Sequence, residues 1–224
     1  MSWLWQQVPS PLGRWRKEGI PSFAAVGGAL AVVASFFSPA FAHHALGGKL
    51  PATAWEGFLS GLAHPVIGLD HLAFVVAIGL VAAGQPWRYG IPLGFVLAGL
   101  VGTGIHLAGW DPLGLTELAI ASSVVLFGLL LVQPRQIPSW LLLIGGSLAG
   151  LFHGYAYAET IIGAQPMPWV GYLLGLSTVQ YGVALLALWA AERWGLRIPG
   201  LTRWAGWAIT VVGAAFLTLA VVGA

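Results

Sequence analysis

Two histidines and an aspartate lie close together in one apolar stretch, and all three side chains are common metal ligands. They are His64, Asp70 and His71, and the same stretch contains Pro65 and Gly68. Seven residues make nearly two helical turns, so His64 and His71 share a face if the helix is continuous. Pro65 and Gly68 also allow a local distortion, and a distorted turn would offer free backbone carbonyls to an ion.

The residue types narrow the choice of metal. The chain has no Cys, which excludes thiolate and iron–sulfur ligation, and it has only two Met residues, which argues against a Cu(I) pathway. Two imidazoles and a carboxylate suit Ni²⁺, Co²⁺, Zn²⁺ or Fe²⁺ better than Mg²⁺ or Ca²⁺. A charge at the centre of a bilayer costs at least about 2.5–3.5 kcal/mol, so such residues in an apolar stretch indicate a function.

A second polar group occurs in a later apolar stretch. His153 lies near its middle, Tyr157 follows four residues later on the same helical face, and Glu159 lies toward one end. We predict that His153 and Glu159 are further metal ligands. His106 and Glu117 are weaker candidates, because a lone polar residue in a span is more often a packing or solvated residue than a ligand.

The composition and its pattern predict the fold class. The chain is 58% hydrophobic and 7% charged, whereas soluble domains carry about 25% charged residues. Continuous apolar runs of the length that a membrane helix requires favour helices over strands. We expect an all-α, polytopic membrane helix bundle surrounded by lipid, and the small net charge of +2 argues against a nucleic-acid partner. Its six transmembrane segments are predicted at 54–83, 88–109, 115–132, 138–163, 168–191 and 202–223.

The first 42 residues have the parts of a secretory signal. A basic stretch precedes an apolar run at 23–37, and an Ala-x-Ala site ends at Ala42. We predict a signal peptide at 1–42 and a six-helix domain at 43–224. The alternative is an uncleaved signal-anchor helix, which would make seven. Both alternatives place His43 on the outer side of the membrane. A cleaved chain would begin with His43 and His44. These two residues are then either a metal-capturing N-terminus or a plain signal junction.

Charges and glycines predict how the helices are arranged. If His43 lies outside, the loops at 84–88, 133–137 and 192–203 lie on the cytoplasmic side. These loops hold most of the basic residues, as the positive-inside rule for inner-membrane proteins predicts: Arg88, Arg135, Arg193, Arg197 and Arg203, against Lys49 outside. Glycines repeat at four-residue spacing and predict close helix contacts, at Gly57 and Gly61, Gly90 and Gly94, Gly146, Gly150 and Gly154, and Gly171 and Gly175.

The His64-x5-Asp70-His71 element in the first mature span, together with Phe152-His153-Gly154 in the fourth, resembles the HupE/UreJ family of nickel/cobalt permeases. The resemblance covers nearly the whole mature chain. It implies secondary uptake of Ni²⁺ or Co²⁺ across the inner membrane, with His64, Asp70, His71, His153 and Glu159 carrying transport. The chain departs from the family pattern at Tyr155 and Tyr157, where many members have further histidines, so its metal preference is left open.

The expected activity is therefore transport and not enzymatic catalysis. The divalent metal ion is then the substrate, and no tightly bound cofactor is expected. Two rivals remain: a membrane metalloprotein with a fixed metal or haem site, and a structural subunit whose polar residues only join helices. The sequence also leaves open the coupling ion, the enzyme served and whether the chain forms a homo-oligomer.

Overall fold

The computed structural model describes residues 49–110, 115–133, 137–195 and 200–222, and all regular secondary structure within these ranges is helical. The predicted signal segment and His43 and His44 lie outside the described residues. In chain order the helices are α2 (Ala54–Ile67), α3 (Leu69–Ala82), α4 (Gly90–Leu107), α5 (Thr116–Val132), α6 (Ser139–Ala158), the 3-10 turn η4 (Glu159–Ile161), α7 (Pro166–Trp194) and α8 (Leu201–Val222).

The predicted polytopic helix bundle is confirmed, with one difference in its first segment. Among the described residues, four helical segments are each long and apolar enough to cross a membrane: α4, α7, α8, and α6 together with η4. Helix α5 is shorter, at 17 residues. The segment predicted at 54–83 is two helices, α2 and α3, bent by 82° at Gly68. The pair forms either a broken span or a re-entrant loop, so the number of crossings depends on how α2, α3 and α5 are counted.

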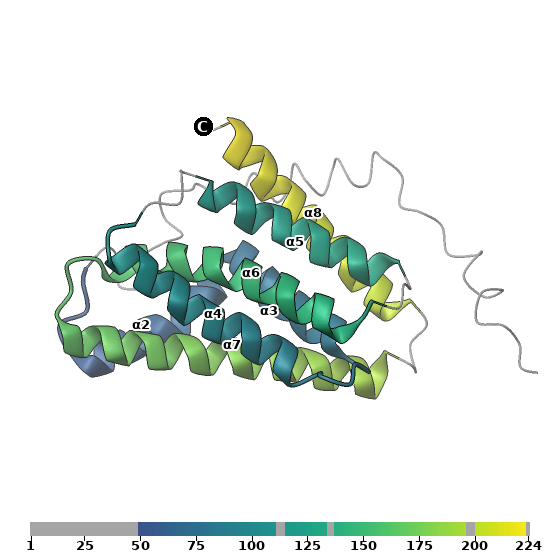
Figure 1. Ribbon diagram of the computed structural model, residues 1–224, viewed down its shortest axis with the longest axis horizontal. Coiled ribbons are helices and arrows are strands. Elements are labelled where there is room, and N and C mark those ends of the chain that lie inside the picture. Colours follow the sequence, from purple (N-terminus) through teal and green to yellow (C-terminus); the bar gives the residue numbers. More distant parts are fainter. Residues whose placement is uncertain (1–48, 111–114, 134–136, 196–199, 223–224) are drawn as a thin grey trace, which may run out of the picture.

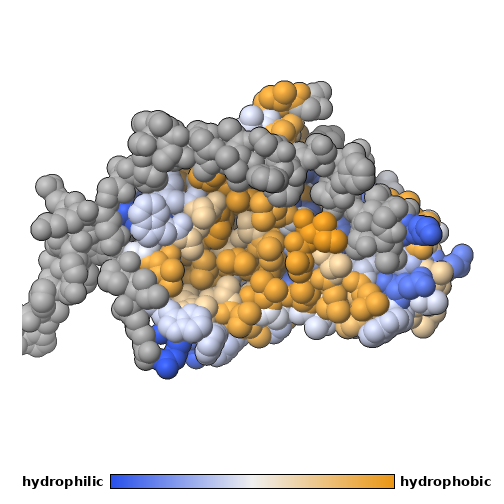
Figure 2. Space-filling view, turned by 180° about the vertical axis from the view of Figure 1, so that it is seen from behind, coloured by the Kyte–Doolittle hydropathy of each residue, from blue (hydrophilic) through white to orange (hydrophobic). Residues whose placement is uncertain are grey.

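The surface has the polarity expected of a bundle embedded in lipid. Figure 2 shows apolar residues across the middle of one face, with hydrophilic residues gathered toward the two ends of the molecule. Aromatic side chains near the helix ends are at least half exposed, as in an interfacial aromatic belt. They include Trp55, Trp87, Tyr89, Trp110, Trp140 and Trp204.

The helices associate as close pairs, α2 with α7, α4 with α6 and α5 with α8, and Figure 1 shows α5 and α8 side by side along one edge of the bundle. Glycine makes the close approach feasible, because a Cβ on Gly154 of α6 would collide with the backbone of Gly99 on α4. The predicted contacts at Gly57, Gly61, Gly150, Gly154, Gly171 and Gly175 are confirmed in this way. Gly90 is an exception, since it begins α4 and has no atom within 4 Å of the position a Cβ would take.

The described parts of the three predicted inside loops lie at one end of the bundle. The Arg88 side chain lies 3.7 Å from a carboxylate oxygen of Glu192, and the backbone N–H of Gly84 donates to the same oxygen at 3.3 Å. These contacts join the loop between α3 and α4 to the end of α7. A cavity of about 350 Å³ opens at this end, lined by α3, α5, α7 and α8 and by Gln85 and Arg203.

Candidate metal-binding site

The helix break at Gly68 brings the two histidines of the first motif together. A straight helix would separate His64 and His71 by about 10.5 Å along its axis, because seven residues rise 1.5 Å each. The 82° bend instead places their ring centroids 5.8 Å apart. Gly68 has an ordinary extended backbone, and it must be small because a Cβ there would lie 2.8 Å from Cδ2 of His71.

His71 and His153 form the centre of the candidate site. Their Nδ1 atoms lie 3.1 Å apart in the interior, where His71 is almost fully buried and His153 completely so. Two imidazole nitrogens that bind one ion at about 2.0–2.1 Å each lie roughly 3 Å apart when the angle at the metal is near 90–100°. The first motif on α3 and the second on α6 therefore present a pair of nitrogen atoms at a separation that one metal ion can bridge.

Asp70 lies in the first turn of α3, which begins inside the bundle because of the break. Its Oδ1 accepts a hydrogen bond from the backbone N–H of His71 at 2.9 Å, and the residue is buried. The positive end of a helix stabilises a carboxylate in this position. The break therefore allows a charged ligand to lie beside the histidine pair at a much lower cost than in a continuous apolar helix.

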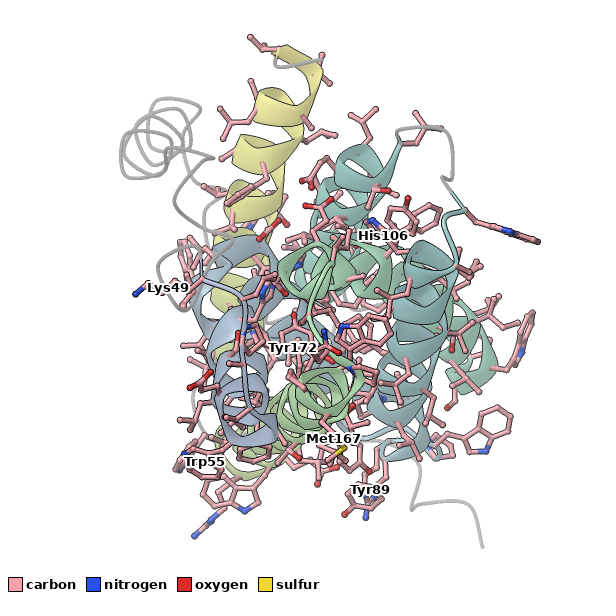
Figure 3. All side chains as sticks on the ribbon, turned by 90° about the vertical axis from the view of Figure 1, so that its left-hand side faces the viewer. Lys49, Trp55, Tyr89, His106, Met167 and Tyr172 are labelled. Carbon is pink, nitrogen blue, oxygen red and sulfur yellow. The ribbon has the colours of Figure 1, made fainter. Side chains whose placement is uncertain are left out.

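The histidine pair is bounded by hydroxyl-bearing rings on one side. Tyr157 packs against His71 and His64, with ring centroids 4.6 and 5.1 Å away, and Tyr172 lies 6.1 Å from His64. Figure 3, which views the bundle from the end where α2 begins, shows Tyr172 among the helices and Trp55 at the periphery. The Tyr157 hydroxyl and the Gln180 side chain are buried close to each other on this side. This side of the pair is therefore polar.

The opposite side of the pair is apolar. Phe74 lies 4.6 Å from the His153 ring and also contacts Phe95 and Phe127, at 5.0 and 4.9 Å between ring centroids. All three phenylalanines are buried. They belong to the same apolar core as Leu142, which also lines the cavity at the Arg203 end. An apolar layer thus separates the histidine pair from that cavity.

Side chains of neighbouring helices fix the end of α6 that carries Tyr157. The Thr103 hydroxyl donates to the carbonyl of Gly154 at 2.8 Å, and the Tyr172 hydroxyl donates to that of Tyr157 at 3.0 Å. His106 Nδ1 lies 2.7 Å from the carbonyl of Tyr155, which only a protonated nitrogen can satisfy. His106 therefore acts here as a packing residue that anchors α6, in line with its weaker standing as a ligand candidate.

The structure brings four of the five predicted ligands together and leaves Glu159 apart. His64, Asp70, His71 and His153 are all buried in the interior, whereas Glu159 is exposed where α6 ends and η4 begins. Glu117, the other acidic candidate, is also exposed. Across the described residues, no three His, Asp or Glu side chains lie close enough to enclose a metal ion as they stand. As the side chains stand, an ion bound to His71 and His153 would need further donors to move closer.

The structure adds two polar residues that sequence reasoning did not single out, Ser123 and Tyr172. The Ser123 hydroxyl oxygen, on α5, lies 3.2 Å from Nε2 of His153. A hydroxyl in the middle of an apolar span was a usable signal for Ser123. No comparable signal exists for Tyr172 or for the phenylalanine layer, because aromatic residues are ordinary in such spans.

Comparison with known proteins agrees with the motifs. The family described as HupE / UreJ protein matches residues 30–216, which is most of the chain. The protein named HupE from Rhizobium leguminosarum bv. viciae is 32% identical over 168 residues, covering 72% of this chain and 85% of that protein. No solved structure matches. The match spans both histidine motifs and the helices that carry them, and the chain therefore belongs to the HupE/UreJ family.

Proposed function

We propose that this protein is a secondary transporter that takes up Ni²⁺ or Co²⁺ across the inner membrane, with the His71–His153 pair as the core of its metal site. The observation that supports this most directly is the 3.1 Å separation of the two Nδ1 atoms in the interior of a lipid-facing bundle. Neutral imidazole nitrogens favour borderline metals such as Ni²⁺ and Co²⁺ over Mg²⁺ or Ca²⁺. Membership of the family points to the same substrates.

The residues around the pair fit a transported ion better than a permanently held one. Only two donors are preformed, and a transport site must release its ion as readily as it binds it. Asp70 and His64 adjoin the pair and are the next ligands along α2 and α3. The buried Tyr157 hydroxyl and the Gln180 amide provide hydrogen-bonding groups for the remaining water shell of a hydrated cation.

The difference between the two sides of the pair supports inward movement of the ion. An ion would enter from the end where exposed Glu159 lies, which we assign to the periplasm, and would meet the polar side formed by Tyr157 and Tyr172. Passage inward requires the layer of Phe74, Phe95 and Phe127 to open, since an apolar constriction excludes a hydrated ion. A membrane potential that is negative inside favours entry by about 2.3 kcal/mol per charge per 100 mV.

The deciding experiment measures accumulation of radiolabelled nickel and cobalt in cells that lack their own importers. Empty vector, wild type and Asp70→Ala are compared at matched membrane expression, and Thr178→Ala, a change at an exposed position on α7, is the control. We expect uptake with wild type and Thr178→Ala and its loss with Asp70→Ala. If correctly inserted wild-type protein accumulates neither metal, the transport proposal is wrong and a fixed metal site or a structural role replaces it.

A further inference from the structure

The Ser123 hydroxyl defines which nitrogen of His153 carries the proton. Its oxygen lies 2.7 Å from the carbonyl oxygen of Ile120 and 3.2 Å from Nε2 of His153. A hydroxyl has one hydrogen to donate, and a carbonyl can only accept. With that hydrogen directed to Ile120, the Ser123 oxygen accepts from the Nε2–H of His153.

The opposite nitrogen of the same ring is thereby left as an acceptor. A neutral imidazole that is protonated at Nε2 has its lone pair on Nδ1. In His153 this is the atom that lies 3.1 Å from Nδ1 of His71. The tautomer that Ser123 selects therefore gives His153 a lone pair on Nδ1, which accepts the Nδ1–H of His71 while the pair is empty. A metal ion that binds both nitrogens takes the place of that hydrogen, and His71 then carries its proton on Nε2.

The surroundings of His153 make this control strong. The ring is completely buried and packs against Phe74 and Phe95, neither of which can accept a strong hydrogen bond from Nε2–H. If the hydroxyl were removed, Nε2–H would lose its acceptor, and an unpaired buried donor costs about 1–3 kcal/mol. The ring would then favour the other tautomer, in which Nδ1 of His153 itself carries the hydrogen. To bind an ion, His153 would have to move that proton to Nε2, where it would have no acceptor.

We infer that Ser123 is a positioning residue for metal capture, which holds His153 as the Nε2–H tautomer so that its Nδ1 and that of His71 bind the same divalent ion. The inference rests on the proposed transport function and adds to it a third helix, α5, that supplies no metal ligand of its own. Ligating histidines commonly donate their other ring N–H to such a partner, and loss of the partner lowers metal affinity by about 10- to 100-fold.

The alternative is that Ser123 only satisfies its own helix, as hydroxyls in spans often do by bonding to a carbonyl one turn back. Two substitutions of equal shape separate these roles. Ser123→Thr keeps the hydroxyl, and Ser123→Val replaces it with a methyl group. The neighbouring Ser122, which is exposed on the same helix, provides the control Ser122→Val.

The test measures the KM and maximal rate of nickel uptake at matched membrane levels, together with Co²⁺ titration of the purified proteins followed by visible absorption. We expect Ser123→Val to raise KM about 10- to 100-fold and to weaken Co²⁺ binding in parallel. Ser123→Thr should restore both values to near wild type, and Ser122→Val should leave both unchanged.

The possible failures are distinguishable. If wild type transports and binds metal but Ser123→Val matches it in KM and Co²⁺ affinity, the positioning role is wrong while the transport function stands. The role is equally wrong if Ser123→Thr is impaired as much as Ser123→Val, because shape and not the hydroxyl would then matter. If wild type neither transports Ni²⁺ nor binds Co²⁺, the proposed function itself fails. Should Ser123→Val not reach the membrane, Ser123→Ala takes its place in the same comparison.

Discussion

His71 and His153 are 82 residues apart in the chain, and their Nδ1 atoms face one another at 3.1 Å in the interior of the bundle. His71 lies in the first turn of the second half of a broken helix, and His153 lies within an unbroken one. Their contact joins the two sequence motifs into one site, so the two residues should act as a unit.

Replacement of either histidine should therefore lower uptake to the same small residual rate, and replacement of both should lower that rate no further. We expect His71→Ala, His153→Ala and the double variant to show equal loss, because one nitrogen donor alone cannot reproduce the pair. Initial rates of nickel uptake at matched expression test this. His106→Ala is the control histidine and should retain uptake. Additive losses in the double variant would show that the two residues act independently.

Gly68 should be sensitive to the smallest enlargement. In Gly68→Ala the new methyl group would meet the His71 ring at about 2.8 Å, which is too close for a relaxed contact, so the imidazole must turn away from His153. We expect loss of uptake with a protein that still inserts and remains monodisperse in detergent. Gly182→Ala, on the open surface of α7, is the matched control. Normal uptake in Gly68→Ala would mean that His71 does not need its observed orientation.

The phenylalanine layer should limit passage after binding. Phe74→Leu thins this layer directly below His153, so we expect faster entry of Ni²⁺ into proteoliposomes that contain a metal-quenched dye. The affinity for metal should change little, because no ligand is altered. Leu97→Ala, at an exposed position on α4, serves as the control. An unchanged rate in a folded Phe74→Leu protein would place the barrier elsewhere.

The contact between α4 and α6 should depend on Gly154. A methyl group there would collide with the Gly99 backbone and force the two helices apart, so Gly154→Ala should lower thermal stability in detergent by several degrees. Gly104→Ala adds the same methyl group to α4 where nothing lies within 4 Å, and it should be neutral or slightly stabilising. Equal melting temperatures for the two variants would argue against close packing of this pair.

The sequence by itself indicated that lipid surrounds the chain, where its helices lie, and most of the polar residues of the candidate site. Lipid cannot satisfy backbone polar groups, so long apolar runs must form helices, and buried charges are too costly to occur there without a reason. These rules are local, which is why the predicted segments and the candidates His64, Asp70, His71 and His153 could be recognised from composition and spacing alone.

Only the tertiary structure decided how those residues meet. Spacing alone placed His64 and His71 on one face of a continuous helix, but the chain breaks at Gly68 and folds the two rings together. The pairing of His71 with His153, the orienting hydroxyl of Ser123 and the separation of Glu159 depend on which helices pack side by side. That packing is set by shape complementarity between distant surfaces, such as Gly154 against Gly99. The glycine spacing indicates which helix faces can approach closely, but it does not indicate which helix each face meets.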